Sequence, residues 1–124
     1  MKQILYIGLN PHTLDFSQPG FEPGLTAEKV EQGINTEIEN LRKAGYETLM
    51  HFLDNGVLDL SGLVTRFKSK KYDGVLIGAG IRIPPGNLIL FEKIINTVHE
   101  HAPGSKLIFN TNPLNSLESI KRWL

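Results

Sequence analysis

The chain has 124 residues, with 13 Lys and Arg balanced by 13 Asp and Glu, and it contains no cysteine. This length is typical of one domain, residues 1–124, with a single core. Zero net charge argues against generic binding of nucleic acid or of an anionic membrane, since both need a basic excess. The lack of cysteine excludes disulfides, thiolate metal sites and cysteine nucleophiles, and it favours a reducing, cytoplasmic location.

No targeting or membrane segment is expected either. The apolar stretch over residues 4–9 is too short for the core of a secretory signal, which has about 7–15 apolar residues before a cleavage site. No run approaches the roughly 20 apolar residues of a membrane span.

Taken in chain order, apolar periodicity and the Gly and Pro positions predict four strands alternating with four helices. The strands are expected over residues 3–9, 46–53, 73–79 and 106–110, and the helices over residues 27–44, 58–70, 88–101 and 116–124.

Residues 10–25 form a long connection for a βα unit, where about 2–6 residues is common. Phe16 and Phe21 within it favour a packed flap. Thr26 is expected to cap the first helix. Gly33, inside that helix, is attributed to close packing against the sheet.

Three further expectations concern the ends of the later helices. Asn87 is expected to cap the third helix, and Asn115 has capping-box spacing to Glu118 before the last one. Trp123 and Leu124 are expected to pack the last helix back on the sheet.

Strict βα alternation predicts a three-layer α/β domain with a parallel sheet between helices. The first and third strands are the most apolar and are expected in the centre, while the second is polar enough for an edge. The resulting order is 2-1-3-4, which leaves the fourth strand at an edge whose only charge is Lys106. Because exposed edges are covered, charged or paired, we expect a homodimer through this edge or the last helix.

The third strand ends in Gly78-Ala-Gly-Ile-Arg82, near the switch point where parallel sheets of this order bind ligands. Glycines let a ligand approach the backbone, and Arg82 offers a planar fork for carboxylate or phosphate. These features predict a site for a small polar or anionic ligand. The candidate ligand-binding residues are Gly8, Asn10, Gly78, Ala79, Gly80, Arg82, Asn110, Thr111 and Asn112.

Each of these candidates has a purely structural alternative. The glycines can form a tight strand-to-loop turn, and Arg82 can pair with Asp15 or Glu92. Asn10 and Asn112 each precede a proline, so turn chemistry alone explains them.

His12 and Asp15 are the weak catalytic candidates, as an acid–base pair in a hydrolase-like enzyme, unless both are merely solvated loop residues. His99 and His101 do not share a helix face, so no metal site is expected there. No cofactor is expected, because the glycines lack the spacing of a dinucleotide or P-loop motif.

Residues 4–8, 23–28, 75–85 and 109–113 resemble an uncharacterised family of small bacterial proteins with a flavodoxin-like, receiver-like fold. The resemblance implies the fold and no established activity. Receiver phosphorylation residues are missing, since Leu9-Asn10 and Gly78-Ala79-Gly80 stand in their places. The loop after the first strand does not look like a flavin phosphate loop. Ligand binding is therefore the leading hypothesis, and a non-catalytic oligomerisation or interaction module is the alternative.

Overall fold

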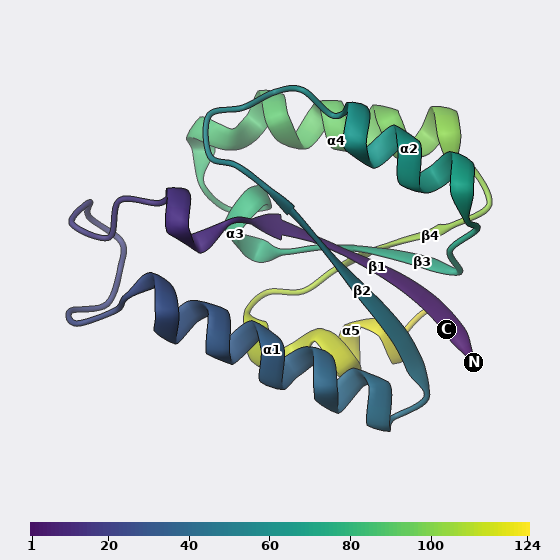
Figure 1. Cartoon of the computed structure of the whole chain (residues 1–124), viewed down its shortest axis with the longest axis horizontal. Coiled ribbons are helices and arrows are strands. Elements are labelled where there is room, and N and C mark those ends of the chain that lie inside the picture. The colour runs from purple at the N-terminus through teal and green to yellow at the C-terminus, as the bar shows by residue number, and fades with distance from the viewer.

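The computed structural model describes the backbone of residues 1–124 and every side chain except that of Pro113. Four parallel strands form one sheet in the order β2-β1-β3-β4 (Figure 1). The strands are β1 (Lys2–Leu9), β2 (Tyr46–Leu53), β3 (Gly74–Ile77) and β4 (Lys106–Phe109). The helices are α1 (Ala27–Lys43), α2 (Ser61–Ser69), α3 (Ala79–Arg82), α4 (Leu88–His101) and α5 (Ser116–Lys121). Single 3-10 turns are η1 (Pro11–Thr13), η2 (Pro85–Asn87) and η3 (Pro113–Asn115). The predicted α/β class and strand order are confirmed.

Two apolar layers sandwich the sheet. Helices α2 and α4 cover one face and α1 and α5 the other (Figure 1). Alternate residues of β1 divide between the layers, because successive side chains of a strand point to opposite faces. Leu5 and Ile7 pack with α2 and α4, while Ile4 and Tyr6 pack with α1 and α5. The central strands β1 and β3 are therefore buried on both faces, as their unbroken apolar runs predict.

The third strand is shorter than predicted. It ends at Ile77, and residues 79–82 form the short helix α3 instead of an open glycine loop. The Gly78 carbonyl accepts the Ile81 amide at 3.0 Å, and the Ile81 side chain is fully buried. Burial of this one isoleucine explains why the chain turns back on the sheet. Helix α2 also starts later than predicted, since the Asp59 carboxylate accepts the Ser61 amide and forms a turn first.

The long connection after β1 is not a flap over the sheet edge. After η1, residues 14–26 project away from the body of the molecule (Figure 1). Phe16 and Phe21 pack on each other, with ring centroids 4.8 Å apart. The two aromatic side chains therefore bury part of their surface on each other within this connection, and they do not cover the C-terminal edge of the sheet.

Three predicted helix-end contacts are wrong, while the Thr26 cap is confirmed by its bond to the Lys29 amide. Asn87 makes no capping bond to α4, because its side chain donates to the Gly80 carbonyl. The capping box near α5 joins Asn112 to Asn115 on η3, and Glu118 is not part of it. Leu124 packs on the sheet as expected, whereas Trp123 is 56% exposed.

Within the described part of the chain, no helix has both the length and the apolar character needed to cross a membrane.

Two glycines play opposite roles. Gly33 is exposed in the middle of α1, and a Cβ added there would meet nothing within 4 Å, so the predicted close packing against the sheet is wrong. Gly74 starts β3 beneath the core, where an added Cβ would lie 2.8 Å from Ile108 Cδ1 and 3.0 Å from Leu124 Cδ1. Of these two glycines, only Gly74 is required by a close approach.

This contrast gives a matched pair of variants. We expect Gly33→Ala to raise the free energy of unfolding by about 0.5–1 kcal/mol, because it removes backbone entropy from the unfolded chain. Gly74→Ala is expected to lower it by about 1–3 kcal/mol through overpacking. Urea denaturation of both variants measures the difference, and equal effects of the two would contradict the packing described for Gly74.

Candidate functional site

The switch point of the sheet lies between β1 and β3, because the chain moves outward to β2 on one side and to β4 on the other. Ligands of open α/β sheets bind beyond the carboxyl ends of the strands at this point. Three connections meet there: residues 10–13 after β1, residues 78–82 after β3, and residues 110–112 after β4.

Asn110 is the centre of a buried polar network at this edge and is only 1% exposed. Its Oδ1 accepts the Ala79 amide at 2.8 Å. Its Nδ2 donates to Ser116 Oγ at 2.8 Å and to the Tyr6 hydroxyl at 3.3 Å. These bonds join the end of β4 to α3, α5 and β1. Asn110 is therefore a structural residue in this conformation, not a group exposed to a ligand as expected.

The glycine turn also offers fewer free amides than expected. The Gly78 amide donates to the Ile7 carbonyl at 2.9 Å, and the Ala79 amide is held by Asn110. Gly8 and Gly78 are both buried. Gly80 alone is exposed, and a Cβ added there would meet nothing within 4 Å. Of the predicted glycine site, only the surface at Gly80 is open to a ligand.

Arg82, at the end of α3, reaches across to the end of β4. Its Nη2 donates to the Asn110 carbonyl at 3.1 Å, and its guanidinium lies over the Phe109 ring, 5.9 Å from the centroid. Arg82 forms no ion pair with Asp15 or Glu92, so that structural alternative is wrong. Its Nε is buried and has no acceptor among the described residues. A buried donor without an acceptor costs about 1–3 kcal/mol.

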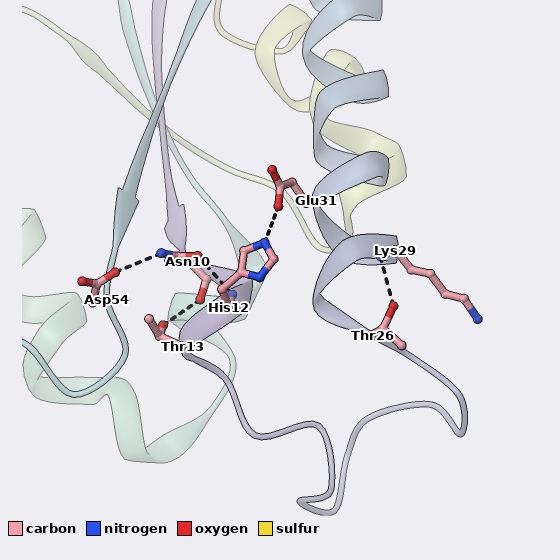
Figure 2. A network of polar contacts seen from close by, with 7 residues as sticks. All are labelled: Asn10, His12, Thr13, Thr26, Lys29, Glu31 and Asp54. Carbon is pink, nitrogen blue, oxygen red and sulfur yellow. Dashed lines mark hydrogen bonds and ion pairs between the residues drawn. The ribbon is translucent and has the colours of Figure 1, made fainter.

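The connections after β1 and β2 are tied into a polar rim (Figure 2). Asn10 Nδ2 donates to Asp54 Oδ1 at 3.1 Å, and Asn10 Oδ1 accepts the His12 amide at 3.0 Å. Thr13 Oγ1 donates to the Asn10 carbonyl at 2.7 Å and accepts the Asn55 amide at 3.0 Å. Asn10 therefore has the turn role that its position before proline predicts, and it also holds two loops together.

His12 pairs with Glu31 of α1 and not with Asp15 (Figure 2). The Asp15 carboxylate instead accepts the Ser17 amide and hydroxyl and the Gln18 side chain. The Ser17 hydroxyl and amide hold the pKa of Asp15 below its usual value. The predicted His12–Asp15 acid–base pair is therefore absent from this structure. His12 and Glu31 are both about half exposed, with fractions of 49% and 42%.

Thr111 and Asn112 both belong to the turn that begins η3. Asn112 Oδ1 accepts the Leu114 amide at 2.8 Å, and Asn115 Oδ1 accepts the Thr111 amide at 3.1 Å. Both residues are exposed. Their polar atoms serve the turn first, as the alternative for Asn112 predicts.

Sequence reasoning missed the pair of Tyr6 and Glu37 below this edge. The Tyr6 hydroxyl donates to Glu37 Oε2 at 3.3 Å, while Glu37 Oε1 is buried without a partner among the described residues. Burial raises the pKa of Glu37 to about 7. Burial, followed by the charge of Glu37, raises the pKa of Tyr6 to about 12. A signal was present, since Glu37 lies three residues after Ile34 and four before Leu41 on the apolar face of the helix.

Two surface cavities lie away from the switch point. One, of about 310 Å³, is on the outer face of α1 around Asn35 and Asn40. The other, of about 510 Å³, is at the opposite edge of the sheet, between Tyr72, His101 and Lys106. Within the described residues, no three His, Asp or Glu side chains gather as a metal site would require.

Comparison with protein-family models, curated proteins and solved structures finds no match to this chain. The resemblance to a bacterial family stays a prediction.

The raised pKa of Glu37 predicts a specific pH dependence of stability. The folded chain binds this proton more tightly than the unfolded chain, whose carboxyl titrates near 4.5. The free energy of unfolding should therefore fall as the pH rises from about 4.5 to about 7. With allowance for the solvent that reaches this carboxyl, the fall is on the order of 1 kcal/mol.

Glu37→Gln removes this titration and keeps the hydrogen-bonding shape. We expect the variant to be more stable than the wild type at pH 8 and nearly equal to it at pH 4.5, in urea denaturation at each pH. A constant difference between the two proteins across this range would contradict the burial of the charge.

Proposed function

We propose that the chain binds a small ligand with an anionic group at the C-terminal edge of the sheet, with Arg82 as the anchor. The observation that carries the proposal is the buried Nε of Arg82, which has no acceptor among the described residues. A carboxylate or phosphate oxygen is the natural acceptor for a guanidinium, because the planar fork matches its geometry.

The surroundings of Arg82 hold its guanidinium in a fixed position, and an acceptor reaches the buried Nε once the side chains that cover it move aside. The Asn110 carbonyl and the Phe109 ring fix the guanidinium from two sides. The Asn110 side chain in turn fixes the start of α3 through the Ala79 amide. A donor held in this way loses little conformational entropy when a ligand binds.

Two neighbouring features would complete the contact. Gly80 leaves the backbone of α3 open to a ligand that approaches from solvent. Across the switch point, the rim of Asn10, His12 and Thr13 offers hydrogen-bonding groups to a neutral polar part of the ligand. Two carboxylates also lie on this rim, since Asp54 accepts Asn10 Nδ2 and Glu31 pairs with His12.

We also propose, from the order of the strands and the absence of cysteine, a cytoplasmic flavodoxin-like protein of the bacterial type that the sequence resembles. The hydrolase-like alternative loses its support, since His12 and Asp15 are engaged with different partners.

A thermal-shift screen with nucleotides, sugar phosphates and carboxylic acids tests the proposal. We expect at least one compound to raise the melting temperature of the wild type. In Arg82→Gln, the affinity for that compound should fall about ten- to a hundredfold, the loss typical of a charge-assisted hydrogen bond. The affinity of Arg82→Lys should lie between those of the wild type and Arg82→Gln, because lysine keeps the positive charge and lacks the planar guanidinium.

Arg122→Gln is the matched control. Arg122 also donates its Nη2 to a carbonyl at the end of β4, that of Phe109 at 3.3 Å, but it is exposed and lies just after α5. Each variant is compared with its own unliganded melting temperature, so a change in stability does not imitate a change in binding. The proposal fails if no compound shifts the wild type, or if Arg82→Gln responds as Arg122→Gln does.

A further inference from the structure

Strand β4 presents an open edge of the sheet. The Lys106 amide donates to the Asp73 carbonyl at 2.9 Å, so Lys106 and, two residues on, Ile108 direct their backbone groups to β3. The amides and carbonyls of Leu107 and Phe109 therefore point outward, as alternate residues of an edge strand do. The Phe109 carbonyl accepts Arg122 Nη2, while Leu107 has no such bond among the described residues.

Apart from Arg122 at the Phe109 carbonyl, strand β4 has few of the usual protections against pairing. It contains no proline, and Lys106 is its one charged residue. Leu88 of α4, the helix on one face of the sheet, and Trp123, just after α5 on the other face, are each 56% exposed. A monomer in water would leave both the backbone groups and these side chains solvated.

One stripe of α4 borders this edge. The stripe consists of four residues spaced four, three and four apart, which therefore share a helix face: Leu88, Glu92, Ile95 and His99. The neighbouring Phe91 packs on Phe109 of β4, with ring centroids 5.9 Å apart. On the far side of α4, Lys93 donates to the Leu58 carbonyl near α2. The stripe thus faces outward above β4.

We infer that the chain forms a two-fold homodimer in which β4 pairs antiparallel with β4 of a second copy. The inference does not rest on the proposed ligand site. With the two-fold axis passing beside Ile108, Leu107 of each copy would lie opposite Phe109 of the other. The outward amides and carbonyls of these residues would then form four backbone hydrogen bonds between the copies. An isologous contact requires a surface complementary to itself, and an antiparallel strand edge meets that requirement. The two sheets would join into one of eight strands.

The polar side chains of the α4 stripe fit the same two-fold axis. Glu92 and His99 lie on either side of Ile95, and both are exposed. An antiparallel arrangement of the two α4 helices brings Glu92 of each copy opposite His99 of the other, with Ile95 near the axis. The stripe therefore has an apolar centre between a carboxylate and an imidazole that can accept and donate a hydrogen bond, and polar pairs of this kind fix register at an interface.

Exchange of the two paired side chains, followed by sedimentation equilibrium, tests this arrangement. We expect the wild type to be dimeric at micromolar concentration. Glu92→Lys should raise the dissociation constant about tenfold or more, because it removes the carboxylate opposite His99 and puts an ammonium group in its place. The double variant Glu92→Lys with His99→Glu should restore dimerisation. Val57→Lys, at an exposed apolar residue between β2 and α2, is the control and should leave the dimer intact.

Amide hydrogen exchange supplies a second measurement that does not depend on these variants. In the dimer, the amides of Leu107 and Phe109 should exchange slowly, and dilution should speed them alone while Lys106 and Ile108 stay protected. A wild type that stays monomeric overturns the inference. A dimer in which the Leu107 amide exchanges fast also overturns it. The same holds if Glu92→Lys leaves the dissociation constant unchanged, or if the double variant fails to restore dimerisation.

Discussion

The side chain of Asn110 holds the C-terminal edge of the sheet together. It accepts the Ala79 amide and donates to Ser116 and Tyr6, so that one amide group joins α3, α5 and β1 to the end of β4. Its backbone carbonyl accepts Arg82. An apolar residue at this position would leave several buried polar groups without partners, each at a cost of about 1–3 kcal/mol. The position of Arg82, and thus the proposed anion site, depends on this arrangement.

The same edge contains buried polar atoms that the described residues do not satisfy. Arg82 Nε and Glu37 Oε1 are both buried without a partner, whereas nearly all buried polar atoms in folded proteins have one. For Glu37, a pKa of about 7 provides an explanation, because a carboxyl that is partly protonated near neutral pH is less costly to bury. An arginine cannot lower the cost of burial by becoming neutral, since its guanidinium stays charged. Arg82 is therefore the group for which an external acceptor matters most.

The sequence was sufficient for the sheet and its order, because the apolar runs of β1 and β3 and the polar character of β2 reflect burial directly. It was insufficient where a residue's role depends on a distant partner. The helix α3 forms because Ile81 is buried, and Asn110 is enclosed by elements far along the chain. His12 selects Glu31, nineteen residues away, over its neighbour Asp15. Glu37 could have been found, since it interrupts an apolar helix face, but its partner Tyr6 lies within a strand whose pattern indicates only burial.

The most direct measurement is the ¹⁵N–¹H spectrum of the wild type, with arginine Nε–H signals included, as an anionic ligand from the screen is added. We expect the Nε–H signal of Arg82 to move downfield and to exchange more slowly with water, together with amide shifts at Gly80 and Ile83. Shifts confined to Tyr72, His101 and Lys106, around the cavity at the opposite edge, would contradict the proposed site.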